Sequence, residues 1–281
     1  GIPAKFKGLM DFRPGRPRDV SQGIEVVADT DTDALRKAGF DPIGIVAGPV
    51  SGTLVWNKLN NGEASIDIAA DLAKSTLNIA PLAWSKPPST AATGKARLVL
   101  AGDRIARIDG LQADGPGFSF RSAVDFPKGR GSELRIDKLS FGTTAVSGLV
   151  RFPSNAPIQI DLAGSSIDLE AKLSEKTPPR DKTAPEPPPG PSWTLAGKFA
   201  RARLARGVSA TDLDVSIAND GRVTTYMKAT GTLPKGASFK IGIGVDNGVR
   251  NIRAMSDNAG DFLRGFDTAR SIEGGKLDLT G

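Results

Sequence analysis

Alternation of apolar and polar residues, repeated in short runs along most of the chain, constrains the fold more than any other feature. The run from 65 to 72 places Ile66, Ile68, Ala70 and Leu72 on one side of an extended backbone. Similar runs recur up to 245, and they are rich in β-branched residues. The pattern predicts many half-buried strands, each with one apolar side.

Turn sequences separate these runs. Short segments rich in Gly, Asp and Asn occur at 101–103, 114–117, 219–221 and 246–248. Such short connections favour hairpins over the long crossovers that parallel strands require. The sequence therefore predicts an all-β protein with one large antiparallel sheet.

A sheet of this size must twist, and it then either closes on itself or curls. Gly, Ala and Ser are frequent on and beside the strands and aromatic residues make up only 6% of the chain, which favours an open groove over a filled interior. For each lining candidate the alternative is a core position against another layer of the same protein. The predicted lining residues are Ile66, Ile68, Leu77, Ile79, Leu98, Leu100, Phe118, Phe120, Ile136, Ile158, Ile160, Ile241 and Ile243.

Two segments depart from the strand pattern. Each has capping and acidic residues first and basic residues with Gly last, which predicts short helices at about 31–38 and 257–264. At an offset of 226 residues the segments also align, pairing Gly39 with Gly265 and Gly48 with Gly274. The alignment predicts one unit used twice, although two similar Gly-capped helices would also match by coincidence.

A proline-rich segment at about 175–192 contains almost no apolar residue. Proline cannot donate to a sheet ladder, so an extended, disordered loop is expected. Because the strand pattern is the same on both sides, we expect residues 1–281 to form one continuous groove segment rather than two domains. The chain begins with Gly1 and ends inside a strand-like run, and we expect it to be an internal part of a longer polypeptide.

The composition excludes several classes of enzyme. The chain has no Cys and no His, which excludes disulfides, thiolate and His-ligated metal sites, and Ser-His-Asp triads. The glycines between 39 and 52 lack the Lys-Ser/Thr of a P-loop, and the segment GFSFR around Ser119 lacks the second Gly that a nucleophile elbow requires. We therefore expect neither a catalytic site nor a cofactor or metal.

Charged residues are interleaved along the chain. The net charge of +6 arises from 37 Lys and Arg against 31 Asp and Glu, without a basic block, and this argues against a nucleic-acid groove. Acidic residues alternate with apolar ones within the strands, which places them on the solvent side of the sheet. A hydrolase that uses two of these carboxylates has little support. The acidic strand residues are Asp67, Asp137, Asp161, Asp168 and Asp214.

Four segments together resemble a known family. "IDIAADLAKSTLNIAPLAWSKPP" from 66, "LSFGTTAVSGLV" from 139, "DLAGSSIDLEAKL" from 161 and the closing 250–281 are similar to the AsmA-like superfamily, and most of all to its large YhdP-type members. The individual patterns are loose, but their order and spacing cover almost the whole chain apart from the proline-rich segment.

The resemblance implies a periplasmic protein tethered to the inner membrane that carries phospholipid between the inner and outer membranes. The partners would be phospholipid acyl chains, and no segment here has the roughly 18–20 apolar residues of a membrane anchor. The alternative is a structural or protein-interaction β module of the cell envelope, whose outer surface binds an envelope partner.

Overall fold

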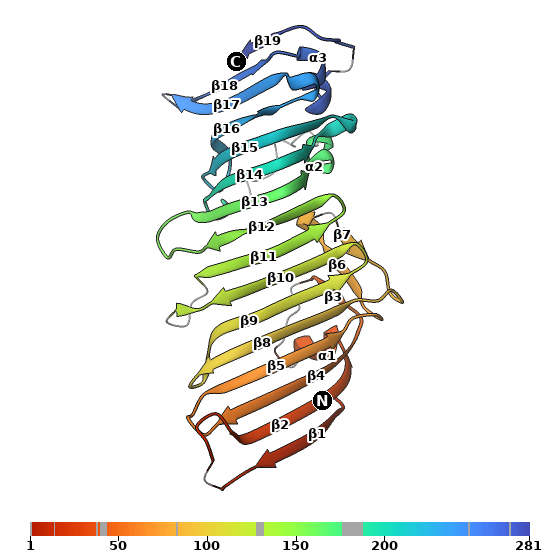
Figure 1. Cartoon of the computed structure of the whole chain (residues 1–281), viewed down its shortest axis with the longest axis vertical. Coiled ribbons are helices and arrows are strands. Elements are labelled where there is room, and N and C mark those ends of the chain that lie inside the picture. The colour runs from red at the N-terminus through yellow and green to blue at the C-terminus, as the bar shows by residue number, and fades with distance from the viewer. Residues whose placement is uncertain are drawn as a thin grey trace. The chain divides into compact units, whose positions relative to one another are not determined.

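The computed structural model describes residues 2–13, 15–37, 39, 44–82, 84–127, 132–175, 188–246, 248–269 and 271–281. Most of these residues lie in strands, and the predicted all-β class is confirmed (Figure 1). The chain divides into two compact units, Gly1–Phe141 and Gly142–Gly281, which are described separately. The division does not fall at the proline-rich segment, where the composition changes most. Residues 176–187 of that predicted loop lie outside the described residues.

The first unit contains one large antiparallel sheet, in which each strand is a neighbour of the next one named. Register shifts interrupt the pairing on both sides of β10, and such bulges bend strands and increase their twist. The strands in spatial order are β1 (Ala4–Met10), β2 (Val20–Asp31), β4 (Pro49–Leu59), β5 (Ala64–Asp71), β8 (Thr93–Ala101), β9 (Arg104–Gly115), β10 (Phe118–Asp125) and β11 (Glu133–Phe141).

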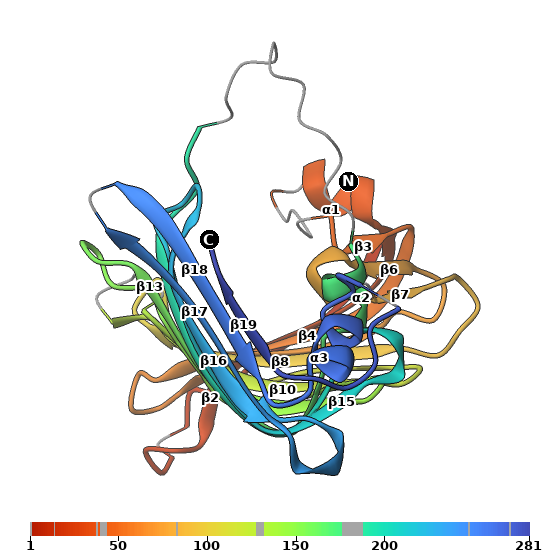
Figure 2. The same ribbon diagram turned by 90° about the horizontal axis from the view of Figure 1, so that it is seen from above.

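A second, three-stranded sheet lies over one end of these strands. This small sheet consists of β3 (Val46–Ala47), β6 (Thr76–Ile79) and β7 (Trp84–Lys86), and it lies on the same side as helix α1 (Thr32–Lys37) (Figure 2). The Trp84 ring packs on Phe118 of β10 with 4.6 Å between ring centroids. The small sheet therefore covers the large sheet at that strand end.

A buried lysine fastens the small sheet to the turn that precedes it. The side chain of Lys86 is only 1% exposed, and its ammonium group donates to the carbonyl oxygens of Leu72, Ala73 and Ser75 at 2.7–3.0 Å. The Ser75 hydroxyl in turn donates to the carbonyl of Pro49. Because every donor of the ammonium has an acceptor, the charge is tolerated away from water.

The second unit is built in the same way. Its sheet is flanked on one side by helices α2 (Glu170–Ser174) and α3 (Ala259–Gly265), and α3 lies inside the curve formed by β15 to β18 (Figure 2). The strands in spatial order are β12 (Thr144–Arg151), β13 (Ile158–Asp168), β14 (Trp193–Arg203), β15 (Ser209–Asn219), β16 (Thr224–Thr232), β17 (Ser238–Asp246), β18 (Val249–Ser256) and β19 (Leu277–Thr280).

One strand pair in this unit corrects the prediction of a wholly antiparallel sheet. Strands β13 and β14 run parallel, with Ile160 opposite Leu195. The long connection from 169 to 192 explains the difference, because a parallel pair needs a crossover that returns the chain to the starting end. The alternation of residues within the strands and the turn residues between them do not indicate to which strand end this connection returns the chain.

Both predicted helices are present within two residues of their expected bounds. Asp31 caps α1 by accepting from the Ala34 amide, and Asn258 caps α3 by accepting from the Asp261 amide. Each helix connects two neighbouring antiparallel strands, β2 and β4 in one case and β18 and β19 in the other. The repeat expected from the sequence therefore has a structural counterpart, a strand–helix–strand unit present in both halves.

We expect Lys86→Met to lower the free energy of unfolding by about 1–3 kcal/mol, because the methionine leaves buried carbonyls without their donor. Urea denaturation followed by tryptophan fluorescence measures the change, since Trp84 lies in the same small sheet. Lys74→Met alters an exposed lysine of the same turn and is the matched control. Equal stability of the two variants would contradict the fastening role of Lys86.

Candidate functional site

A continuous row of large apolar side chains crosses the sheet of the first unit. Trp56 lies opposite Ile66, Ile66 opposite Leu98, and Leu98 opposite Ile108. Directly opposed residues place their side chains on the same face of a sheet, so the register alone builds the row. We call this side of each sheet the apolar face. The full row is Ile24, Trp56, Ile66, Leu98, Ile108, Val124 and Leu134.

Small residues form a second row on the same face, nearer to α1 and the small sheet. A Cβ atom added at Gly52 would approach only backbone atoms within 4 Å, and at Gly94 the first contact is the Leu72 side chain at 3.7 Å. The side chains of this row are shorter, so the apolar face is recessed along it relative to the row that contains Trp56. The small residues are Ala28, Gly52, Ala70, Gly94 and Ala113.

The second unit carries a comparable row of large side chains. Ile160 lies opposite Val150 on one side and Leu195 on the other, and Ile243 lies opposite Met227 and Ile252. The parallel pair does not interrupt the row. Its members are Val150, Ile160, Leu195, Ile217, Met227, Ile243 and Ile252.

Within each unit the described residues cover the apolar face at one strand end. In the second unit Phe262 of α3 and Phe266, which directly follows the helix, pack on Phe239, with their ring centroids 6.1 and 5.8 Å from that of Phe239. Away from this end the rows remain half-buried, and Ile24 is 45% exposed. Half-exposed apolar side chains in continuous rows, with no described layer of the same unit opposite them, are a candidate binding surface.

The structure places eleven of the thirteen predicted lining residues on the apolar face of the large-sheet strands in the two units. Most are half-buried, whereas Phe118 is buried beneath Trp84. Leu77 and Ile79 instead belong to β6 of the small sheet, where Leu77 is buried. Their run alternates like the others, but it forms part of the segment inserted between β5 and β8.

Sequence reasoning missed several members of the rows. Trp56 was missed because the apolar Val55, on the opposite face, interrupts the alternation of apolar and polar residues in β4. Trp193, which lies opposite Ile158, directly follows the proline-rich segment and was not assigned to a strand. The other row members absent from the predicted lining all lie opposite apolar partners in the sheet register, and they are Ile24, Ile108, Val124, Leu134, Val150, Leu195, Ile217, Met227 and Ile252.

The opposite side of each sheet, which we call the charged face, carries ion pairs between strands. All five acidic strand residues lie in ion pairs, four of them between strands and one, Asp137 with Arg135, within β11, as expected for side chains that alternate with the apolar rows. Their partners are exposed or half-exposed, and surface pairs of this kind add little stability each. The pairs are Asp67 with Arg97, Asp137 with Arg135, Asp161 with Arg151, Asp168 with Arg203 and Asp214 with Lys198.

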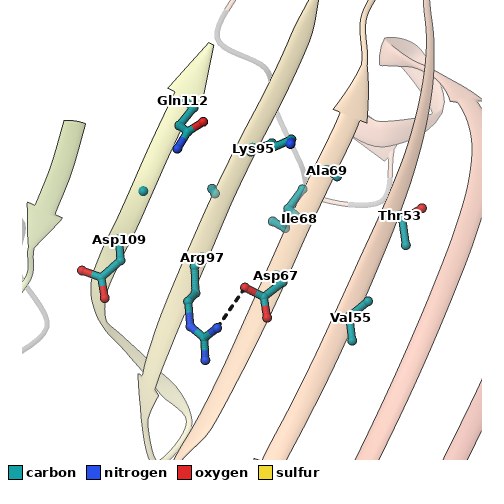
Figure 3. Close-up of a pocket in the computed structure, with 11 residues that line it drawn as sticks. Thr53, Val55, Asp67, Ile68, Ala69, Lys95, Arg97, Asp109 and Gln112 are labelled. Carbon is teal, nitrogen blue, oxygen red and sulfur yellow. Dashed lines mark hydrogen bonds and ion pairs between the residues drawn. The ribbon is translucent and has the colours of Figure 1, made fainter. Parts of the chain in front are cut away.

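The charged face also contains an open hollow of about 430 Å³ (Figure 3). Arg97 lies toward Asp67 across it, with 3.5 Å between Nη1 and Oδ1, and its other nitrogen donates to the Ser65 hydroxyl. Asp109 is paired separately with Arg107 at 2.8 Å. Each of the two carboxylates therefore has its own arginine partner.

Another ion pair of the charged face perturbs a pKa. Arg121 donates to the Asp114 carboxylate at 2.8 Å, and this hydrogen bond lowers the pKa of Asp114, partly opposed by desolvation. The lowered pKa means that the ionised carboxylate stabilises the fold at neutral pH.

Other site types find no support in the described part of the chain. It contains no cluster of three or more acidic side chains placed to hold a metal ion. Among the described helices, none has the length and apolarity needed to cross a bilayer. In comparisons with known proteins, no family model, curated protein or solved structure matched the chain.

We expect the coupling between Asp114 and Arg121 to depend on pH. Because the pKa of Asp114 is lowered from 3.8, the stabilisation is complete above that value and is lost as pH falls through the lowered one. Both side chains are partly exposed, so a double-mutant cycle with Asp114→Asn and Arg121→Gln should give less than about 1 kcal/mol at pH 7. A coupling energy that persists or grows in acid would contradict this assignment.

Proposed function

We propose that this chain binds phospholipid acyl chains along its apolar faces. The observation that carries the proposal is the pair of continuous rows of large apolar side chains, which contain Trp56 in the first unit and Leu195 in the second. The side chains of these rows remain half-exposed. Surfaces of this kind and extent on a folded protein mark places where an apolar ligand or partner is bound.

The energy available from such binding is large. Burying one methylene group yields about 0.8 kcal/mol, so a sixteen-carbon chain gains on the order of 10 kcal/mol by leaving water. The row in the first unit crosses seven strands, which corresponds to about 29 Å at the usual strand spacing of ~4.8 Å. This length exceeds the ~15 Å that acyl chains occupy in one leaflet of a bilayer. One row therefore has room for a whole acyl chain laid across the strands.

The uniformity of the rows favours movement over fixed binding. Each position offers a similar aliphatic or aromatic contact, so no point holds the chain much more tightly than its neighbours. Such a surface needs no covalent step, catalytic residue or cofactor. Polar head groups would remain in water at the strand ends that α1, α3 and the small sheet leave uncovered.

The cellular part of the proposal rests on the sequence resemblance. If the chain is an AsmA-like, YhdP-type protein, its groove would belong to an inner-membrane-anchored periplasmic protein that carries phospholipid between the inner and outer membranes. The curled, open sheets with short helices at one strand end are compatible with that family assignment. The location, the tether and the direction of transport are part of the proposal.

A structural or protein-interaction module of the cell envelope is the competing function. It is favoured by the internal packing at one strand end, where Trp84 covers Phe118 and the α3 phenylalanines cover Phe239. If a protein partner covered the remaining rows as well, lipid would be excluded from them. The following experiments distinguish the two functions.

Quenching by brominated lipid tests contact with the rows directly. Trp56 and Trp193 both lie on apolar faces. A variant that keeps only Trp56 of the three tryptophans, and another that keeps only Trp193, should therefore each lose fluorescence when phospholipid with brominated acyl chains is added. A variant with Ala69→Trp as its only tryptophan places the indole on the charged face of β5 and should be quenched far less. Equal quenching at all three positions would indicate nonspecific association, and no quenching would favour the protein-interaction module.

Charged substitutions test the same surface by lipid content. Ile68→Asp and Ile160→Asp introduce a carboxylate into the apolar faces, and we expect phospholipid recovered with the purified protein to fall at least twofold. Ala69→Asp and Gln159→Asp place the same charge one residue away on the opposite face and are the matched controls. Native mass spectrometry measures occupancy, and circular dichroism checks that the sheet is retained. Unchanged lipid content in the two apolar-face variants would overturn the proposal.

A further inference from the structure

Two glycines in the middle of β17 are not explained by packing, by backbone conformation or by a bulge. A Cβ atom added at Gly242 or Gly244 meets no atom within 4 Å, and neither residue has the positive φ that favours glycine. The pairing of β17 with β16 and with β18 has no register shift, so neither glycine belongs to a bulge. Among the glycines of the described strands, only Gly8 shares these properties.

Glycine at such positions weakens the sheet. Its backbone loses more freedom on folding than that of other residues, and it has no side chain to pack against its neighbours. Apart from bulges and tight bends, glycine inside a strand marks a place where a ligand or another backbone approaches closely. No described segment lies over the two glycines of β17, so the close approach of a ligand is the explanation that remains.

Three cationic residues lie around Gly242 on the charged face of the second unit. Lys228 of β16 lies directly opposite Gly242 on one side and Arg253 of β18 on the other, while Lys240 precedes it by two residues on β17. All three cationic side chains are exposed. They border an open hollow of about 640 Å³, whose floor includes Gly242 and Gly244.

Positive charge is in excess around this hollow. Arg253 pairs with Asp278 at 3.5 Å, but the two lysines have no acid within ion-pair distance among the described residues. The acid that β15 contributes to the same face, Asp214, pairs with Lys198 on its other side at 3.7 Å. The hollow therefore retains positive charge that an anion would neutralise.

The other end of the hollow is polar and uncharged. Asn251 lies opposite Gly244, and Tyr226 directly precedes the pair of Met227 with Ile243, which places it on the other side of Gly244. Both Tyr226 and Asn251 are exposed. Amide and phenol groups donate hydrogen bonds to hydroxyl groups and accept them in return. A ligand lying on the glycine floor therefore meets cations at one end and hydrogen-bonding groups at the other.

The spacing of the cations favours phosphate over carboxylate. Neighbouring strands lie ~4.8 Å apart, so the backbones of Lys228 and Arg253 are about 10 Å apart across Gly242. Their long side chains reach inward from both sides to a group above the glycine. A phosphate group offers three strong acceptor oxygens, so separate cations can each bind one. A carboxylate is matched best by a single bidentate arginine.

We propose that this hollow binds the phosphate ester of a hydroxyl-bearing molecule, such as a glycerol phosphate or a sugar phosphate. The phosphate contacts the three cations around Gly242, and the hydroxyl-bearing part lies on the glycine floor between Tyr226 and Asn251. Soluble esters and phospholipid head groups share this chemistry. The hollow is on the face opposite the apolar rows, so the inference does not depend on the binding of acyl chains.

Glycerol 3-phosphate is the probe for a soluble ligand. We expect its phosphorus NMR signal to shift saturably when the full chain is added, and raised salt to weaken the binding. Inorganic phosphate lacks the hydroxyl groups and should bind at least threefold more weakly. Co-sedimentation with phosphatidylcholine vesicles, prepared with and without phosphatidylglycerol, tests the lipid head group as the source of the phosphate ester.

Substitutions separate the charge of the hollow from its floor. Lys228→Gln and Lys240→Gln each remove one positive charge, and we expect binding to fall at least fivefold in either variant. Gly242→Val places a side chain on the floor where it meets no protein atom at Cβ, so binding should fall at least fivefold while urea denaturation shows equal or greater stability. Lys95→Gln removes an exposed lysine from the charged face of the first unit and is the matched control, with unchanged binding.

Loss of glycerol 3-phosphate binding in the lysine and Gly242→Val variants would support a soluble ligand. Binding to phosphatidylglycerol vesicles alone, with the same losses, would support a head group. Three outcomes would overturn the proposal: no saturable binding of either probe, unchanged binding in both lysine variants, or an equal loss in Lys95→Gln. Brominated-lipid quenching should be the same in all these variants, so failure of this proposal is distinguishable from failure of acyl-chain binding.

Discussion

A sheet with one apolar face must cover that face with something, and here the described chain covers it only in part. In each unit helices or a small sheet pack against one end of the strands, while the rows containing Trp56 and Leu195 stay half-exposed. The remaining apolar surface is the constraint from which the rest of the interpretation follows. In the proposed function, phospholipid acyl chains supply the missing contacts.

The two faces of the sheets separate stability from binding. The charged face joins neighbouring strands through ion pairs and keeps the outside of the sheet soluble, whereas the apolar face supplies large rows with little internal packing. Stability therefore depends heavily on the covered strand ends, where Lys86 holds three carbonyl groups and Phe239 meets the phenylalanines of α3.

The strands, the two helices and the direction of most side chains could be predicted from the sequence, because alternation and capping are local signals. Ile66 and Ile160 lie on the faces that their spacing requires. The parallel pairing of β13 with β14 and the burial of Leu77 in the small sheet could not be predicted, since both depend on where a long connection returns. Trp56 was missed because an apolar Val55 on the opposite face obscured its period.

The parallel pair also affects how the second unit forms. Every other neighbouring pair in that unit is antiparallel, and most are joined by short turns that close rapidly. Joining β13 to β14 closes the connection from 169 to 192, whose conformational entropy must be lost before the ladder can form. We therefore expect β14 to β18 to assemble as a local meander first, with docking of that meander onto β13 as the slower step of folding.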